Sequence, residues 1–111
     1  MKWIPLTTES QLQEIIDLSK NTPQVIFKHS TRCSISSMAL NRMEQADQPA
    51  NIDFYYLDLI QYRPISQQIA ELFSVYHESP QVLLIKDGNC TYSETHMGIS
   101  MDELIAQVNL V

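Results

Sequence analysis

Cys33 is one of only two cysteines in the chain, and basic residues precede it closely. Arg32 stands immediately before it, and Lys28 and His29 lie slightly upstream, in a stretch that we predict to be a loop. The thiolate form of cysteine is the nucleophile, and nearby cations stabilise it. We therefore expect Arg32 and Lys28 to lower the pKa of Cys33 below the value of about 8.5 for a free cysteine. His29 is either a base for Cys33 or a polar loop residue without a chemical role.

The residues around Cys33 predict a strand that leads into a helix. Val25–Phe27 is a short apolar run, as expected for a buried strand. Apolar residues then recur at helical spacing, at Ile35, Met38, Ala39 and Met43. Cys33 would thus lie in the first helical turn, where unpaired N–H groups and the positive end of the helix dipole favour a thiolate. The alternative, a buried cysteine that only packs, fits this position less well.

The rest of the chain alternates between strands and helices. We predict strands at 3–6, 25–27, 52–59, 82–85 and 89–93, and helices that begin near Thr8, Cys33, Pro64 and Ser100. The third helix keeps its apolar period as far as Tyr76, and Asp87-Gly88 marks a tight turn between the last two strands. The order β-α-β-α-β-α-β-β-α predicts an α/β fold with a mixed central sheet and helices on both faces. Ligands of such sheets bind beyond the carboxyl ends of the parallel strands, where Cys33 also lies.

Composition narrows the functional classes. The 111 residues are expected to form one domain, 1–111. The net charge of −6 argues against nucleic acid as a partner, because phosphate binding needs concentrated Lys and Arg. No apolar run approaches the ~20 residues of a membrane span, and the N-terminus has no apolar region typical of a secretory signal. Two cysteines are too few for a disulfide framework, so we expect a cytoplasmic protein that does not bind membranes.

The second cysteine and two of the histidines are expected to have structural roles. Cys90 falls in the predicted hairpin and should be a half-buried packing residue. A role in resolving a disulfide would require its Cα to lie within about 7 Å of the Cα of Cys33. His77 and His96 should be solvated, and no Cys or His pair has the close spacing of a metal site. We therefore expect neither a metal nor a bound cofactor.

Several separated segments resemble known redox proteins. The order of elements, with a cysteine after the second strand and a proline before the fourth, resembles the thioredoxin superfamily over nearly the whole chain. Within it, the segments FKHST (27–31), TRCSIS (31–36) and ESPQVLLIK (78–86) are similar to the YtxJ family of monothiol bacilliredoxins. Two positions depart from thioredoxins: Ser36 replaces the second cysteine of the C-x-x-C pair, and Phe27 stands where thioredoxins have a buried aspartate.

This resemblance implies a thioredoxin-like fold and a particular set of site residues. The catalytic residue would be Cys33, and the Ser79–Pro80 peptide bond beside it would be cis. The thiolate-stabilising residues would be Arg32, Lys28 and Ser36, and the substrate-binding residues would be Ser79 and Pro80. Ser36, one turn after Cys33, is expected to donate a hydrogen bond to the sulfur, but it has no thiol with which to resolve a disulfide.

The function that the resemblance implies is that of a monothiol thiol–disulfide oxidoreductase. It would remove bacillithiol, a low-molecular-weight thiol, from mixed disulfides on client proteins, with bacillithiol as the thiol co-substrate. Cys33 would keep the small thiol until a second thiol or a reductase removes it. Two alternatives remain at this point: an enzyme of the same fold that uses glutathione, and a redox-inactive thioredoxin-like binding module in which Cys33 is incidental.

Overall fold

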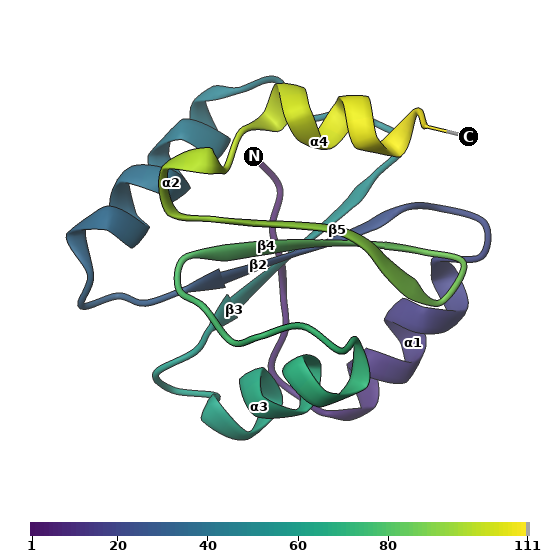
Figure 1. Cartoon of the computed structure of the whole chain (residues 1–111), viewed down its shortest axis with the longest axis horizontal. Coiled ribbons are helices and arrows are strands. Elements are labelled where there is room, and N and C mark those ends of the chain that lie inside the picture. The colour runs from purple at the N-terminus through teal and green to yellow at the C-terminus, as the bar shows by residue number, and fades with distance from the viewer. Residues whose placement is uncertain (111) are drawn as a thin grey trace.

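The computed structural model describes residues 1–110, which form an α/β fold around one five-stranded sheet (Figure 1). The strands are β1 (Ile4–Pro5), β2 (Gln24–His29), β3 (Asp53–Asp58), β4 (Gln81–Lys86) and β5 (Asn89–Thr95). The helices are α1 (Ser10–Leu18), α2 (Ser34–Gln45), α3 (Arg63–Leu72) and α4 (Met101–Val108), with a short 3₁₀ helix η1 (His96–Gly98) before α4. This confirms the predicted order, with η1 as an addition. Within these residues, no helix is long and apolar enough to cross a membrane.

The sheet is mixed, as predicted, and β2 lies at its centre. The strand order is β1-β3-β2-β4-β5. β3 runs parallel to both β1 and β2, whereas β4 runs antiparallel to β2 and β5 antiparallel to β4. All six residues of β2 are buried, because helices cover the strand on both faces. This double burial explains why its sequence is a continuous run rather than an apolar–polar alternation.

Two helices cover each face of the sheet. In Figure 1, α2 and α4 lie above the sheet and α1 and α3 lie below it. Alternate residues of β2 point to opposite faces: Val25 and Phe27 pack in the α2–α4 layer, whereas Ile26 packs in the α1–α3 layer. Because its residues alternate between the two layers, β2 belongs to both halves of the core. Fully burying one such side chain stabilises the fold by about 1.5–3 kcal/mol.

The third helix ends earlier than predicted. α3 stops at Leu72, and Ser74 has a φ of 54°, which takes the chain out of the helical conformation. Tyr76, predicted to continue the apolar face of this helix, is 92% exposed. The segment 74–80 is therefore a loop that leads into β4, and it brings His77 to the same edge of the sheet as the end of β2.

The predicted turn at Asp87-Gly88 joins β4 and β5. Both residues have positive φ, 51° for Asp87 and 80° for Gly88, as a two-residue hairpin turn of this type requires. The end of α1 supports the turn: the N–H of Asp87 donates to the Ser19 C=O at 3.0 Å, and the N–H of Gly88 donates to Ser19 Oγ at 2.8 Å. The hairpin end of the sheet is thus fixed against α1.

Three loops meet at the opposite end of the sheet. The N–H of Leu59, just after β3, donates to the C=O of His29, the last residue of β2, at 3.0 Å. Gln81, the first residue of β4, pairs with Lys28 near the end of β2. The loops that follow β2 and β3 and the loop that precedes β4 therefore lie side by side, on the left in Figure 1. We refer to this end of the sheet as the loop edge.

Candidate active site

Cys33 lies at the loop edge as the N-cap residue of α2, and its side chain is partly exposed. Its backbone is extended, with a φ of −112°, and its C=O accepts the N–H of Ser37 at 3.1 Å. Its own N–H donates to the Ser30 C=O at 3.2 Å, which closes the turn after β2. The predicted first-turn position is therefore off by one residue, but the thiol does lie at the helix N-terminus, where a substrate can reach it.

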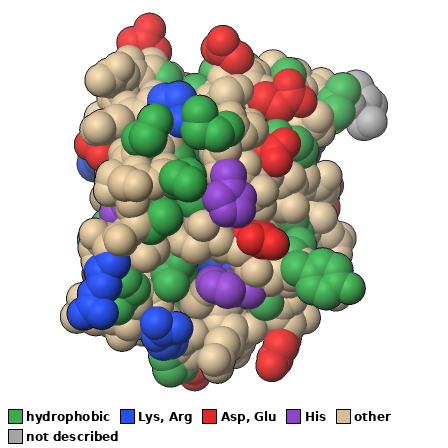
Figure 2. Space-filling model, turned by 60° about the vertical axis from the view of Figure 1, so that its left-hand side comes forward, with side chains coloured by type: hydrophobic (Ala, Val, Ile, Leu, Met, Phe, Trp, Pro, Cys, Tyr) green, Lys and Arg blue, Asp and Glu red, His purple; other side chains and the backbone are tan. Residues whose placement is uncertain are grey.

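Arg32 is exposed beside Cys33, and its surroundings are mixed in charge. Figure 2 shows one face of the molecule near this end: Lys and Arg side chains stand out at its lower left, histidine side chains lie near its middle, and most of the acidic side chains lie in its upper part. Within residues 1–110, the guanidinium of Arg32 takes part in no hydrogen bond. It is therefore available to an anionic ligand.

Lys28 does not lie in a loop, so that prediction is wrong. β2 extends to His29, and strand alternation directs Lys28 to the α3 side of the sheet, whereas Cys33 lies at the end of α2 on the other side. Lys28 is 0% exposed, and its Nζ lies 2.8 Å from His77 Nδ1 and 3.1 Å from Gln81 Oε1. Burial lowers the pKa of Lys28 to about 8, with a smaller opposing effect of Glu78.

Ser36 and His29 form a buried polar pair on the α2 side of the sheet. Ser36 is 0% exposed and His29 is 4% exposed. Ser36 Oγ lies 2.7 Å from His29 Nδ1 and accepts the N–H of Ser30 at 3.0 Å. Burial lowers the pKa of His29, although Asp58 acts in the opposite direction, so the imidazole is neutral at pH 7. His29 is thus not a loop residue, and the Ser36 hydroxyl bonds to His29 and Ser30 instead of to the Cys33 sulfur as predicted.

Ser79 and Pro80 lie at the loop edge, next to the end of β2. The Ser79–Pro80 peptide bond, expected to be cis, is cis. Pro80 directly precedes Gln81, which pairs with Lys28, and its C=O accepts the N–H of His96 at 3.1 Å. The backbone groups of Ser79 make no hydrogen bond within the described chain. They are available to an extended substrate.

Cys90 lies at the other end of the sheet from Cys33. It pairs with Ile85, which pairs with Gln24 at the start of β2, whereas Cys33 lies beyond the end of that strand. The five steps along β2 at about 3.3 Å each separate the two cysteines by roughly 16 Å or more, too far for a disulfide. Cys90 is partly buried against the α1–α3 core, and burial raises its pKa. No three His, Cys, Asp or Glu side chains of residues 1–110 lie close enough to hold a metal.

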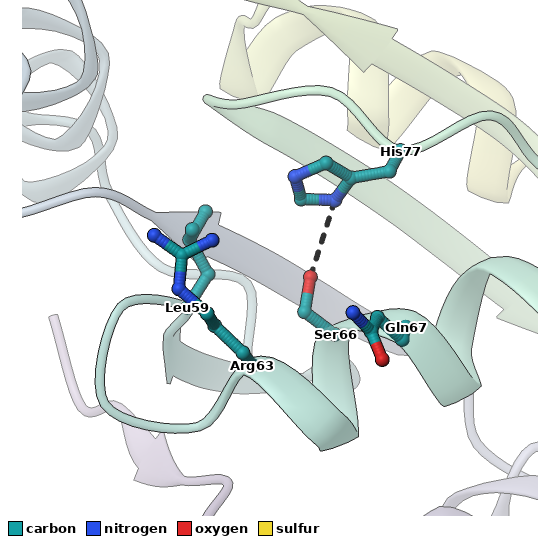
Figure 3. A pocket seen from close by; sticks show the side chains of 5 residues that line it. All are labelled: Leu59, Arg63, Ser66, Gln67 and His77. Atoms are coloured by element: carbon teal, nitrogen blue, oxygen red, sulfur yellow. Dashed lines mark hydrogen bonds between the residues drawn. The ribbon is translucent and has the colours of Figure 1, made fainter.

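A small pocket, which sequence reasoning missed, opens on the α3 side of the loop edge (Figure 3). Its volume is about 80 Å³, and its lining residues are Leu59, Arg63, Ser66, Gln67 and His77. His77, predicted to be merely solvated, lies with Nδ1 2.8 Å from Lys28 Nζ and 3.2 Å from Ser66 Oγ. These residues come from three segments that only the fold brings together. The one sequence feature that could have pointed to this pocket is that His77 lies three residues before Pro80, which the resemblance places beside Cys33.

Comparisons with known proteins agree on the fold. The sequence model of a protein family described as monothiol bacilliredoxin BrxC matches residues 4–104. A solved structure described as having a thioredoxin fold superposes with a TM-score of 0.83 at 29% identity, covering 96% of this chain and 93% of that chain. Thioredoxin from Fasciola hepatica superposes with a TM-score of 0.70 at 20% identity, covering 94% of each chain. Thioredoxin from Trypanosoma brucei brucei gives 0.72 at 14% identity, covering 96% of this chain and 88% of that chain. At these low identities the two thioredoxins show the shared fold alone.

Proposed function

Since this chain belongs to the monothiol bacilliredoxin family BrxC and has the thioredoxin fold, it is a thiol oxidoreductase, and we propose that it removes bacillithiol from mixed disulfides on protein cysteines. The observation that carries this proposal is the placement of the two cysteines. Cys33 is a partly exposed thiol at the N-terminus of α2, and Cys90 lies at the far end of the sheet. A cytoplasmic location suits the proposal, because unpaired thiols persist in a reducing compartment.

The proposed reaction is a thiol–disulfide exchange at Cys33. The Cys33 thiolate attacks the bacillithiol sulfur of the mixed disulfide, and a new S–S bond forms between Cys33 and bacillithiol. The S–S bond to the client protein breaks at the same time, and its electron pair leaves with the client sulfur. The client thiolate then takes a proton from water. One disulfide replaces another, so this step needs no external oxidant or reductant.

The bacillithiol adduct on Cys33 should persist, because no second thiol of the chain can attack it. Ser36 has the position of a resolving cysteine, but its hydroxyl is buried and bonded to His29. Cys90 is out of reach. Release therefore requires an external thiol: a second low-molecular-weight thiolate attacks the small-thiol sulfur, forms a symmetrical disulfide and returns Cys33 as a thiolate.

Client proteins are proposed to bind as an extended segment beside Ser79 and Pro80. The free backbone groups of Ser79 at the loop edge can pair with such a segment, as a strand adds to the edge of a sheet. Arg32, exposed next to Cys33, is proposed to contact an anionic group of the client or of the small thiol through charge-assisted hydrogen bonds. The partners that this predicts are S-thiolated client proteins and a carboxylate-bearing small thiol.

The proposal is tested by following the small thiol by mass spectrometry. Purified protein is mixed with a client protein that carries a bacillithiol mixed disulfide. The chain should gain the mass of one bacillithiol on Cys33 only, and the client should regain a free thiol. Cys33→Ala should abolish the transfer, and Cys90→Ala should transfer at the rate of the parent protein.

Two outcomes of the same experiment would contradict the proposal. Equal rates with bacillithiol and glutathione mixed disulfides would keep the monothiol chemistry and refute the preference for bacillithiol. No transfer from either disulfide, with both thiols of the chain intact, would favour a binding module in which Cys33 has no redox role.

A further inference from the structure

A buried cation on the α3 side of the loop edge has no role in the exchange reaction. Lys28 is 0% exposed, and its nearest polar groups are uncharged: Gln81 Oε1 and His77 Nδ1. Burial of an ammonium group without a directly bonded carboxylate is costly. Lys28 contacts His77, which lines the pocket, so its positive charge lies next to a residue of that pocket.

Hydrogen bonding fixes which nitrogen of His77 carries the proton. An ammonium group has only donors, so Lys28 Nζ donates to His77 Nδ1 at 2.8 Å. Nδ1 is then the acceptor, and in a neutral imidazole the hydrogen must be on Nε2. In Figure 3, Nδ1 faces Ser66, and the other ring nitrogen points toward the side of the pocket where Arg63 lies. His77 therefore presents an N–H donor to the pocket.

Arg63 presents its guanidinium to the same space. It is the first residue of α3, exposed, and Figure 3 shows its guanidinium across the pocket from the imidazole ring of His77. Within residues 1–110 the guanidinium forms neither an ion pair nor a hydrogen bond. The pocket thus has an N–H donor of His77 on one side and the donors of Arg63 on the other, and the charge of Lys28 lies 2.8 Å from His77 Nδ1. This arrangement suits a small anion.

We propose that this pocket binds a carboxylate group of the low-molecular-weight thiol that Cys33 accepts. This inference rests on the proposed function and identifies the part of the chain that recognises the small thiol. A volume of about 80 Å³ is enough for a group of a few heavy atoms but not for a whole thiol, so the remainder would extend toward Cys33. Leu59 lines the pocket and bonds to the C=O of His29, four residues before Cys33, which places pocket and thiol at the same edge.

The charges around His77 predict that a bound carboxylate raises the pKa of His77. Burial lowers the pKa of His77, and the positive charge of Lys28 lowers it further. Glu78 acts in the opposite direction, and Arg63 adds a smaller lowering effect. A carboxylate between His77 and Arg63 would favour the imidazolium form and raise the pKa of His77. This gives a measurement that does not depend on turnover.

The first test compares two mixed disulfides of one client protein, one with bacillithiol and one with cysteamine, which has no carboxylate. Arg63→Gln should lower kcat/KM for the bacillithiol disulfide by about tenfold, the effect of one lost charge-assisted hydrogen bond. The same variant should leave the cysteamine rate within about twofold of the parent. Lys20→Gln is the matched control: Lys20 is exposed near the β4–β5 turn, at the other end of the sheet.

The outcomes separate the pocket from the exchange reaction. If Arg63→Gln leaves both rates unchanged, the pocket has no role in recognition and the inference is wrong. If it slows both substrates equally, the pocket contacts the client protein, and the inference is again wrong. In either case, transfer by the parent protein leaves the proposed function standing. Absence of any transfer by the parent protein would overturn both.

The second test follows the His77 imidazole by NMR in two stable adducts of Cys33. The pKa of His77 should be higher in the bacillithiol adduct than in the cysteamine adduct, and Arg63→Gln should reduce this difference. Lys20→Gln is again the control, and it should leave the difference between the two adducts unchanged. An equal pKa of His77 in the two adducts would show that no carboxylate reaches the pocket.

Discussion

Two neighbouring residues of β2, His29 and Lys28, are both buried polar side chains, but their partners differ in access to solvent. On the α2 side, His29 bonds to Ser36, which is itself 0% exposed. On the α3 side, Lys28 is equally buried, but it bonds to His77, which is exposed and lines a pocket. We call the His29–Ser36 pair the closed pair, because both side chains are buried, and the Lys28–His77 pair the open pair, because His77 is exposed to solvent. The α2 side of the loop edge is accordingly the closed side, and the α3 side is the open side.

This difference assigns separate tasks to the two faces of one strand. A closed pair cannot exchange protons or bind a ligand, so His29 and Ser36 fix the turn that carries Cys33. An open pair responds to solvent and to ions, so Lys28 and His77 are suited to recognition. If the two proposals hold, the nucleophile and the recognition pocket lie on opposite faces of the sheet and meet at its loop edge.

The largest expected effect is on the amount of bacillithiol adduct on Cys33, and it comes from replacing Ser36 of the closed pair by cysteine. Residues three apart on a helix are neighbours on one face, and a disulfide requires Cα atoms about 4.4–6.8 Å apart. Ser36→Cys should therefore let the adduct on Cys33 collapse to an internal disulfide. The isolated bacillithiol adduct should fall by about tenfold or more, because intramolecular attack outpaces release by an external thiol. The internal disulfide forms as bacillithiol leaves as a free thiol, so mass spectrometry of the monomer should show the mass of the dithiol less two hydrogen atoms.

The control for this change is Ser93→Cys, which adds a thiol away from Cys33. Ser93 is exposed on the edge strand β5, two strands away from β2. This variant should accumulate the adduct like the parent protein. An adduct that persists in Ser36→Cys would mean that the closed pair does not hold position 36 in reach of Cys33.

The fold was predictable from the sequence because its signals are local. The apolar run 25–27, the helical spacing after Cys33 and the positive-φ turn at Asp87-Gly88 each determine structure within a few residues. The C-terminal end of β2 was not predictable in this way. Its last two residues are polar and read as loop, and only partners as distant in sequence as His77 and Gln81 make the burial of Lys28 tolerable.

The same reason limited the prediction of the site. Cys33 and the cis bond before Pro80 followed from the local sequence and the resemblance. The role of Ser36 did not, because its partner His29 was taken for a loop residue. The pocket residues have no common motif, and their contacts depend on the loop formed where α3 ends early.

On the open side, the titration of Lys28 should make the stability of the protein depend on pH between about 8 and 10. Burial lowers the pKa of Lys28 from 10.5 to about 8. Between these two pH values the unfolded chain keeps a proton that the folded protein has lost, so stability rises with pH. From pH 8 to 10 the free energy of unfolding of the parent should rise by about 1 kcal/mol relative to Lys28→Met, roughly half of the value for the full pKa shift, because solvent screens part of the effect.

Urea unfolding at several pH values measures this difference. Comparison with Lys28→Met cancels the contributions of other groups, such as tyrosines, that titrate in the same range. Lys20→Met, at an exposed position, should follow the parent throughout. A constant difference between parent and Lys28→Met from pH 8 to 10 would mean that Lys28 keeps its proton in the folded protein, and the distinction between the two faces would lose this support.

The smallest expected effect comes from a matched pair of serines, one on each side. Ser36 and Ser66 both lie in helices, are 0% and 2% exposed, and bond to a histidine Nδ1. Ser36→Ala should lower the free energy of unfolding by about 1–2 kcal/mol, because it leaves a buried imidazole nitrogen of His29 and the partly buried N–H of Ser30 unpaired. Ser66→Ala should cost less than about 0.5 kcal/mol, because His77 keeps Lys28 as a partner and also meets water. Both variants replace serine by alanine in a helix, so the change in helix propensity is the same. The difference between their free energies of unfolding in urea therefore reflects the hydrogen bonds lost on each side. Equal costs would show that the α2 side is no more closed than the α3 side.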